Sequence, residues 1–209
     1  MDLVHKYFPV NQAIEKFIES EDVKDINKIL DVLEVKNRTI NILDINEDSG
    51  TLMSSYIRLW NKVDDEYEKP VAERKPIKIY IDSSGGDLVS TFSIIDSIKL
   101  SKTPVTTINI SKAYSGGLFI FLSGHKRIAY PNSSFLFHEG STAMQGDAHK
   151  FQNLADFYKR QREQIKKIVL SNTSITEEVY EAKRKDDWWF NADEAVELGV
   201  ADEIAANLE

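Results

Sequence analysis

The sequence predicts an α/β fold in which parallel strands alternate with helices that cover the sheet. Residues 77–81 and 105–110 alternate apolar or β-branched residues in the way that is typical of strands. Each run leads through a glycine-containing turn into apolar residues at helical spacing. Because this order of strand, turn and helix repeats, consecutive strands are expected to be parallel, as they are in βαβ units.

Composition narrows the class of protein. The chain has 209 residues, a formal net charge of -8 and no cysteine. This length suits one domain with an added segment. An acidic chain argues against nucleic acid or an anionic membrane as the main partner. The lack of cysteine excludes disulfides, thiolate catalysis and cysteine-based metal sites.

The N-terminal third divides into an extension and the start of the main domain. Residues 1–36 carry apolar side chains at helical spacing, interrupted near 20–22, which predicts two short amphipathic helices. We therefore divide the chain into an N-terminal helical extension, 1–36, and a main domain, 37–209. The elements predicted next are a strand at 38–45, a turn at 48–50, a helix at 52–63 and an exposed charged loop at 64–76.

The C-terminal half continues the pattern and contains one long helix. The first predicted elements are strands at 126–130 and 135–138 and a long helix at 148–170. A capping box of Ser174 and Glu177 is expected to open a further helix, and an aromatic loop follows at 186–190. Asn191 and Glu194 are expected to open a last helix, which stops at Gly199. No apolar run reaches the roughly 18 residues of a membrane helix. Residues 1–6 lack the pattern of a signal peptide. We expect a cytoplasmic protein.

Ser115 is the first candidate catalytic residue. It follows the strand at 105–110 and precedes Gly116, Gly117 and an apolar helix. At such a helix N-terminus, backbone amides and the helix dipole can stabilise an oxyanion, and glycines let a substrate approach closely. A plain turn with a serine cap is the alternative, since the strict G-x-S-x-G motif is absent. Lys112 is a further candidate base, although it precedes Ser115 on the same turn.

Several motifs, in this order, resemble the family of Clp protease proteolytic subunits (ClpP). They are the glycine turn at 83–86, the Ser115 turn, a strand that ends at His138, and the segment 192–199. The similarity covers about 38–204. It implies a crotonase-like fold of βαβ units, in which the long helix at 148–170 protrudes as a "handle".

The resemblance also implies a Ser-His-Asp triad. Ser115 matches the nucleophile of the family, His138 its general base and Asp187 the acid that orients the histidine. The backbone amides of Gly86 and Gly116 match its oxyanion hole. Peptidases of this family need no metal or cofactor for this chemistry. The expected reaction is therefore hydrolysis of peptide bonds.

Assembly and partners are implied in the same way. The family forms rings of seven subunits that stack in pairs, degrades peptides and unfolded proteins, and works with an AAA+ unfoldase. This sequence departs from the family pattern at Ser84, at Glu139 and Gly140, and at Asp186, which is also the rival of Asp187 in the triad. We favour Asp187 because it keeps the family spacing to Ala192.

These departures leave two other functions open. The chain could be a catalytically inactive ring subunit with a structural or regulatory role. A crotonase-type acyl-CoA enzyme is the other alternative, since one fold hosts several chemistries. The sequence shows no constellation of acidic residues of the kind such hydratases use, and that enzyme would leave Ser115 and His138 unexplained.

Overall fold

The computed structural model describes residues 34–138, 140 and 147–208. The chain divides into two compact units, residues 1–39 and 40–209. Of the first unit, only 34–39 belong to the described residues. The two predicted N-terminal helices within 1–36 fall almost wholly outside them, and the extension stays a prediction. The site lies in the second unit.

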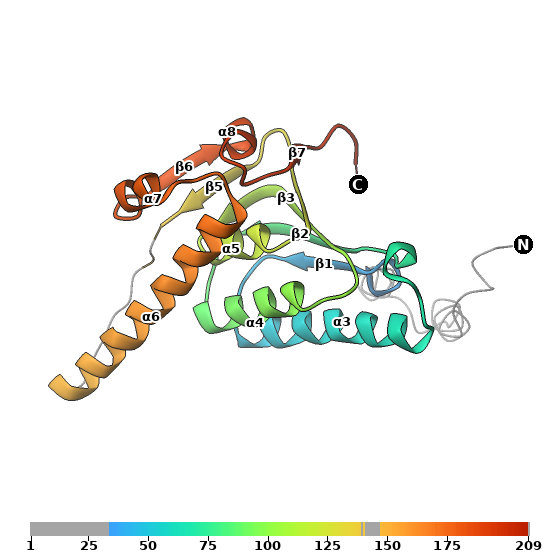
Figure 1. Cartoon of the computed structure of the whole chain (residues 1–209), viewed down its shortest axis with the longest axis horizontal. Coiled ribbons are helices and arrows are strands. Elements are labelled where there is room, and N and C mark those ends of the chain that lie inside the picture. Colours follow the sequence, from blue (N-terminus) through green and yellow to red (C-terminus); the bar gives the residue numbers. More distant parts are fainter. Residues whose placement is uncertain (1–33, 139, 141–146, 209) are drawn as a thin grey trace, which may run out of the picture. The chain divides into compact units, whose positions relative to one another are not determined.

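A mainly parallel sheet forms the centre of the second unit (Figure 1). Its order is β1 (Thr39–Ile42), β2 (Ile77–Ser83), β3 (Val105–Tyr114), β4 (Lys126–Ala129) and β7 (Glu203–Ile204). The pairs β2–β3, β3–β4 and β4–β7 are all parallel. The predicted α/β class and the parallel arrangement are therefore confirmed.

The C-terminal end of β3 also pairs with a further strand of the same seven-stranded sheet, off the main strand order. Residues Lys112–Tyr114 pair in parallel with β5 (Ser134–Phe137), and β5 pairs antiparallel with β6 (Trp188–Asn191). The predicted aromatic loop at 186–190 is thus wrong for most of its length. β6 forms because Phe190 packs against Phe135, which is distant in the sequence. The two rings are stacked, with 5.3 Å between their centroids.

Six helices of the described chain complete the unit (Figure 1). They are α3 (Glu47–Glu66), α4 (Leu88–Lys99), α5 (Gly116–Leu122), α6 (Ala148–Asn172), α7 (Glu177–Lys183) and α8 (Ala192–Glu197), with a short 3₁₀ turn, η2 (Val71–Glu73). Helices α3 and α4 pack side by side. Helix α5 is wholly buried, which agrees with its apolar sequence. The predicted long helix at 148–170 is confirmed as α6.

Two predicted helix starts need correction. The predicted turn at 48–50 is the first turn of α3, because Asn46 caps the helix in a reciprocal box with Ser49. Gly50 allows α3 to pack closely against α4, since a Cβ on it would lie 2.8 Å from the Cβ of Ser90 on α4. The cap of α7 is Thr176, whose side chain accepts the Val179 amide. The predicted box at Ser174 is therefore wrong, whereas the box of Asn191 with Glu194 is confirmed.

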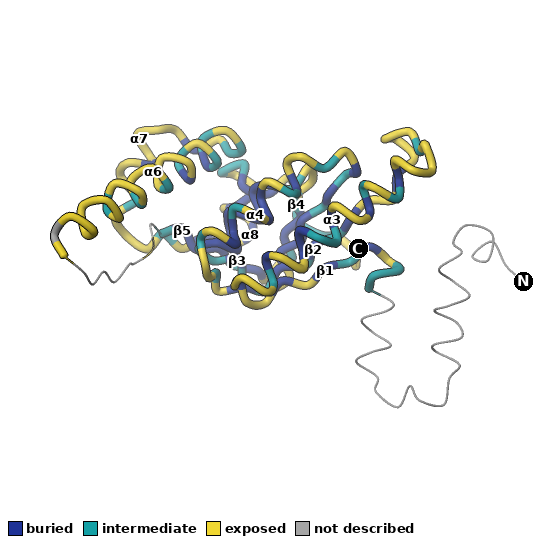
Figure 2. The backbone as a smooth tube through the Cα atoms, turned by 90° about the horizontal axis from the view of Figure 1, so that it is seen from below, coloured by how far each residue is buried: buried dark blue, intermediate teal, exposed yellow. Residues whose placement is uncertain are grey.

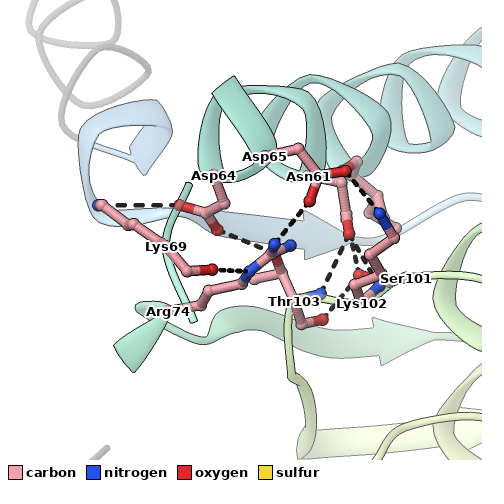
Figure 3. A network of polar contacts seen from close by, with 9 residues as sticks. Asn61, Asp64, Asp65, Lys69, Arg74, Ser101, Lys102 and Thr103 are labelled. Atoms are coloured by element: carbon pink, nitrogen blue, oxygen red, sulfur yellow. Dashed lines mark hydrogen bonds and ion pairs between the residues drawn. The ribbon is translucent and has the colours of Figure 1, made fainter. Parts of the chain in front are cut away.

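The charged stretch predicted as an exposed loop at 64–76 is partly buried, and its side chains belong to a network of polar contacts (Figure 3). Asp64 is fully buried at the end of α3, where its carboxylate accepts a hydrogen bond from the Thr103 hydroxyl at 2.8 Å. The Arg74 guanidinium is also buried and bonds Asp65 at 2.5 Å. Burial without such partners would be costly, so the network holds this loop on the ends of α3 and β3.

The buried core follows the strands and the helices packed on them, whereas the outer part of α6 is mostly exposed (Figure 2). Alternate residues of β2, namely Ile77, Ile79 and Ile81, are fully buried. This alternation is the period-two pattern from which the strand was predicted. Among the described helices, none is both long and apolar enough to cross a membrane.

Candidate active site

Ser115 sits in a strained turn between β3 and α5. Its backbone has φ 53° and ψ -120°, a conformation that residues other than glycine seldom adopt. The turn is held on both sides, because the Ser115 amide donates to the Leu136 carbonyl at 2.9 Å and the Ser115 carbonyl accepts from the Leu118 amide at 3.0 Å. Such strain costs about 1–3 kcal/mol and clusters at functional sites.

The glycine turn after β2 packs directly against Ser115. A Cβ on Gly85 would lie 2.8 Å from the Ser115 Cβ, closer than side chains can approach. Gly85 and Gly86 also have φ values of 100° and 155°, so glycine is required there for both space and conformation. The glycine turn at 83–86 and the Ser115 turn are therefore in direct contact, although they are far apart in the sequence.

The strand-like segment at Ile45 fixes the position of Gly86. The Ile45 amide donates to the Gly85 carbonyl at 3.4 Å, and the Asp87 amide donates to the Ile45 carbonyl at 2.8 Å. This isolated parallel bridge uses neither polar group of Gly86 itself. Gly116 is the first residue of α5, so its amide has no carbonyl within the helix to bond. Both amides are thus suited to bind an anion.

His138 follows β5, and Asp187 precedes β6. In the antiparallel pair the last residue of β5, Phe137, lies opposite the first residue of β6, Trp188. Continuing the register by one residue sets His138 opposite Asp187, and their Nδ1 and Oδ1 atoms are 3.9 Å apart. This separation is an ion-pair distance if the imidazole is protonated, but it is too long for a hydrogen bond.

The same register separates the two candidate acids. Asp187 contacts His138, whereas the rival Asp186 uses its amide to bond the Lys183 carbonyl and has an exposed side chain. The side chain of Asp187 is itself 62% exposed, and that of His138 is 31% exposed. Of the two candidate acids, Asp187 is therefore the one that lies near His138, in a site that is open to solvent.

These elements surround one pocket of ≈ 390 Å³. Ser115, Gly116, Gly86 and His138 all line it, and α6 closes its far side. Its volume falls within the range of ligand sites, which is about 300–1,000 Å³. Among the described residues, the pocket receives His138 and not Lys112, so the alternative base finds no support in the geometry.

The N-terminus of α4 forms another wall of the pocket. The Asp87 carboxylate caps this helix and accepts the Ser90 amide at 2.7 Å. Hydrogen bonds from the backbone and side chain of Ser90 lower the pKa of Asp87 below its ordinary value of 3.8. Within the described part of the chain, no cluster of His, Asp and Glu is arranged to hold a metal ion.

Sequence reasoning did not find the residues that α6 contributes to the pocket. Phe157 and Gln161 lie one turn apart on α6 and both line the pocket. Phe157 carried a weak signal, as an apolar residue of an amphipathic helix. Gln161 carried none, because a glutamine in a polar helix normally faces solvent.

Comparison with known proteins agrees with the arrangement. Residues 67–208 match the sequence profile of the Clp protease family. The chain is also 39% identical over 135 residues to the ATP-dependent Clp protease proteolytic subunit 2 of Treponema denticola, a match that covers 64% of this chain and 68% of that protein. With an α/β fold consistent with the family and most of its length within the family profile, this chain belongs to the Clp protease family.

Proposed function

We propose that the chain is a serine endopeptidase in which Ser115 is the nucleophile, His138 the general base and Asp187 the residue that orients the base. The observation that carries the proposal is the shared pocket of Ser115, His138, Gly86 and Gly116 beside a strained serine turn. Membership of the Clp protease family supports the same reaction.

In the proposed reaction, His138 takes the hydroxyl proton as the Ser115 oxygen attacks a peptide carbonyl. A serine hydroxyl is a weak nucleophile at neutral pH and needs such a base. Asp187 holds the imidazole in the tautomer that accepts this proton and stabilises the imidazolium that forms. We assign the oxyanion hole to the amides of Gly86 and Gly116. In a serine protease, removal of one oxyanion-hole donor raises the activation free energy by about 2.7–4 kcal/mol.

The tetrahedral intermediate then collapses and the peptide C–N bond breaks. His138 returns its proton to the leaving amine, and the substrate acyl group remains as an ester on Ser115. Water, deprotonated by His138, attacks the carbonyl carbon of this ester. The bond from that carbon to the Ser115 oxygen then breaks, the Ser115 oxygen takes the proton back from His138, and the new carboxylic acid is released. The cycle consumes one water for each peptide bond and needs no other reactant.

The wider biology is proposed from the family. We propose that the substrates are peptides and unfolded proteins, that the subunits form a ring of seven or two such rings, and that an AAA+ unfoldase delivers substrates in the cytoplasm. The named relative is an ATP-dependent protease subunit, which supports such a partnership. Residues 1–36 are proposed as an extension outside the peptidase domain, 37–209.

The test is labelling of the full-length protein with a fluorophosphonate, read by intact mass. We expect one adduct on the wild type, at Ser115, and none on Ser115→Ala. His138→Ala should reduce labelling by at least about 100-fold, because the nucleophile loses its base. Two matched controls, Ser84→Ala at an exposed serine and His149→Ala at an exposed histidine of α6, should label like the wild type. Labelling of Ser115→Ala would overturn the proposal.

One observation favours the alternative of an inactive ring subunit. The distance of 3.9 Å between His138 and Asp187 leaves the triad without its orienting hydrogen bond in the isolated chain. If the protein folds and forms rings in analytical ultracentrifugation but resists both the fluorophosphonate and peptide hydrolysis, the structural role replaces the peptidase role.

A further inference from the structure

We infer that Thr91 is a positioning residue, which sets the relative placement of the two amides assigned to the oxyanion hole, those of Gly86 and Gly116. The inference rests on the proposed peptidase function and adds to it a residue that the substrate does not touch. Thr91 is the fourth residue of α4 and is fully buried. It lies behind the wall of the pocket that Ser115 lines and is not part of that wall.

Thr91 holds the residue that follows Gly86. The amide and the hydroxyl of Thr91 both donate to the Asp87 carbonyl, at 3.0 and 2.8 Å. The Asp87 amide donates in turn to the Ile45 carbonyl at 2.8 Å. Both backbone polar groups of Asp87 are thus engaged, which fixes the peptide groups on either side of its Cα. Because Gly86 has no side chain to limit its conformation, its orientation depends on such anchors.

The same hydroxyl lies against Gly116. A Cβ on Gly116 would lie 2.6 Å from the Thr91 Oγ1 and 3.6 Å from the Thr91 Cγ2. The first distance is shorter than side chains can approach, so the Thr91 side chain fills the space beside the Gly116 Cα. Since Gly116 begins α5, this contact limits how closely the start of α5 can approach α4.

The hydroxyl bond of Thr91 is not explained by the stability of α4 alone. A threonine in a helix can bond the carbonyl four residues earlier, and this bond by itself does not strengthen the helix. Here the bond ends at the residue next to Gly86, and the oxygen that donates it lies against Gly116. One buried side chain therefore contacts both segments that carry the assigned amides, and it sets the distance between them.

An oxyanion hole depends on where its donors lie. Each donor must lie about 2.7–3.1 Å from the position that the oxyanion takes in the transition state. Loss of a whole donor lowers kcat by roughly 10²–10³, so a displaced donor that still bonds weakly should lower it by about tenfold. Binding of the uncharged substrate depends on the rest of the pocket, and KM should therefore change little.

Thr91→Val tests the positioning role. Valine has nearly the shape of threonine but cannot donate to the Asp87 carbonyl, and its methyl group is larger than the hydroxyl beside Gly116. With a peptide coumarin amide, and with rates expressed per serine labelled at completion by the fluorophosphonate, kcat should fall about tenfold and KM should stay within about twofold. A peptide aldehyde, whose adduct on Ser115 places an oxygen in the oxyanion hole, should inhibit about tenfold more weakly.

Thr91→Ser is the conservative variant. Serine keeps the hydroxyl that donates to Asp87, so this variant should retain at least about half of the wild-type kcat. Should Thr91→Val fail to fold, Thr91→Ala gives the same measurements, because alanine removes the hydroxyl and adds no bulk beside Gly116.

Thr107→Val is the matched control. Thr107 of β3 is also fully buried, and its hydroxyl donates to the Phe121 carbonyl at 2.8 Å. It too lies against a glycine, Gly124, because a Cβ there would collide with the Thr107 Oγ1. Gly124 follows the C-terminal end of α5, whereas Gly116 begins this helix. The control thus makes the same change in the same kind of contact away from the oxyanion hole, and it should keep kcat within about twofold.

The outcomes separate this inference from the proposed function. If Ser115→Ala abolishes hydrolysis but Thr91→Val keeps kcat within about twofold, raises KM alone, or loses no more kcat than Thr107→Val, the positioning role is refuted and the peptidase stands. If the wild type does not cleave the peptide, or Ser115→Ala cleaves it normally, the proposed function fails and this inference fails with it.

Discussion

His138 lies opposite Asp187 just beyond the β5–β6 pair, with 3.9 Å between Nδ1 and Oδ1. The pairing of Phe137 with Trp188 creates this relationship, since one further residue on each strand brings the two side chains together. A small closure would turn the contact into a hydrogen bond of about 2.9 Å. Substrate binding is expected to supply that closure, because catalytic hydrogen bonds often tighten only in the complex.

Asp187→Asn tests this relationship. The amide would hold the imidazole in the wrong tautomer and could not stabilise the imidazolium, so kcat for peptide hydrolysis should fall by roughly 10²–10⁴. KM should change little, because Asp187 does not contact the substrate in the proposed reaction. Steady-state kinetics with a coumarin peptide measure both.

Asp186→Asn is the control for that variant, because it makes the same chemical change at the neighbouring exposed acid. It should retain kcat within about twofold, in line with the small effects of most surface substitutions. The opposite result, with Asp186→Asn inactive and Asp187→Asn active, would move the triad acid to Asp186.

Gly86→Ala should destabilise the protein and abolish hydrolysis. The new Cβ would lie 2.0 Å from the Ile45 carbonyl oxygen, which is backbone and cannot rotate away. The φ of 155° adds a backbone cost of about 1–3 kcal/mol. Urea unfolding followed by circular dichroism should show a lower midpoint, and labelling of Ser115 should be lost.

Gly140→Ala separates the steric clash with Ile45 from the cost of placing alanine at a positive φ. Gly140 also has a positive φ, 75°, but no described atom lies within 4 Å of its added Cβ. This variant should lose only the backbone part of the stability. Equal losses in both variants would show that the contact between Gly86 and Ile45 contributes nothing.

Asp64→Ala should be strongly destabilising although it lies away from the pocket. It would leave the buried Thr103 hydroxyl without its acceptor and remove the charge 3.8 Å from Lys69. Breaking a buried charged network typically costs about 3–5 kcal/mol. Glu66→Ala, two residues later and 61% exposed, should change the free energy of unfolding by less than about 0.5 kcal/mol. Urea denaturation of both variants measures the difference.

The Asp87 cap predicts a pH-dependent contribution to stability. The folded state lowers the pKa of Asp87 below 3.8, so the ionised carboxylate stabilises the fold above that pH. As pH falls through the lowered pKa, protonation removes the contribution. Asp87→Ala should therefore cost about 1 kcal/mol at pH 7 and progressively less below pH 3.8.

Asp87→Asn is the control for the charge. Asparagine keeps an oxygen that can accept the Ser90 amide, so the cap should survive with little loss at pH 7. Urea midpoints at pH 7, 5 and 3 measure both variants. If the loss of stability in Asp87→Ala, relative to the wild type, stays constant down to pH 3, the ionised cap is ruled out.

Local sequence patterns were enough to predict the α/β class and the long helix. Each correct prediction depended on a pattern that spans only a few neighbouring residues. These patterns are the alternating burial of Ile77, Ile79 and Ile81, the apolar run after Ser115, and the capping box of Asn191 with Glu194. Ser115 was a candidate from its place between a strand and an apolar helix, whereas His138 and Asp187 were candidates only through the resemblance to the Clp protease family.

Only the tertiary structure decided which distant residues meet. The register of β5 on β6 set Asp187 rather than Asp186 beside His138, and packing of the loop after α3 buried Asp64. The position of α6 placed Phe157 and Gln161 beside the pocket that Ser115 lines. Their chemistry depends on partners far along the chain, because burial and strand register are properties of the assembled fold and not of local sequence.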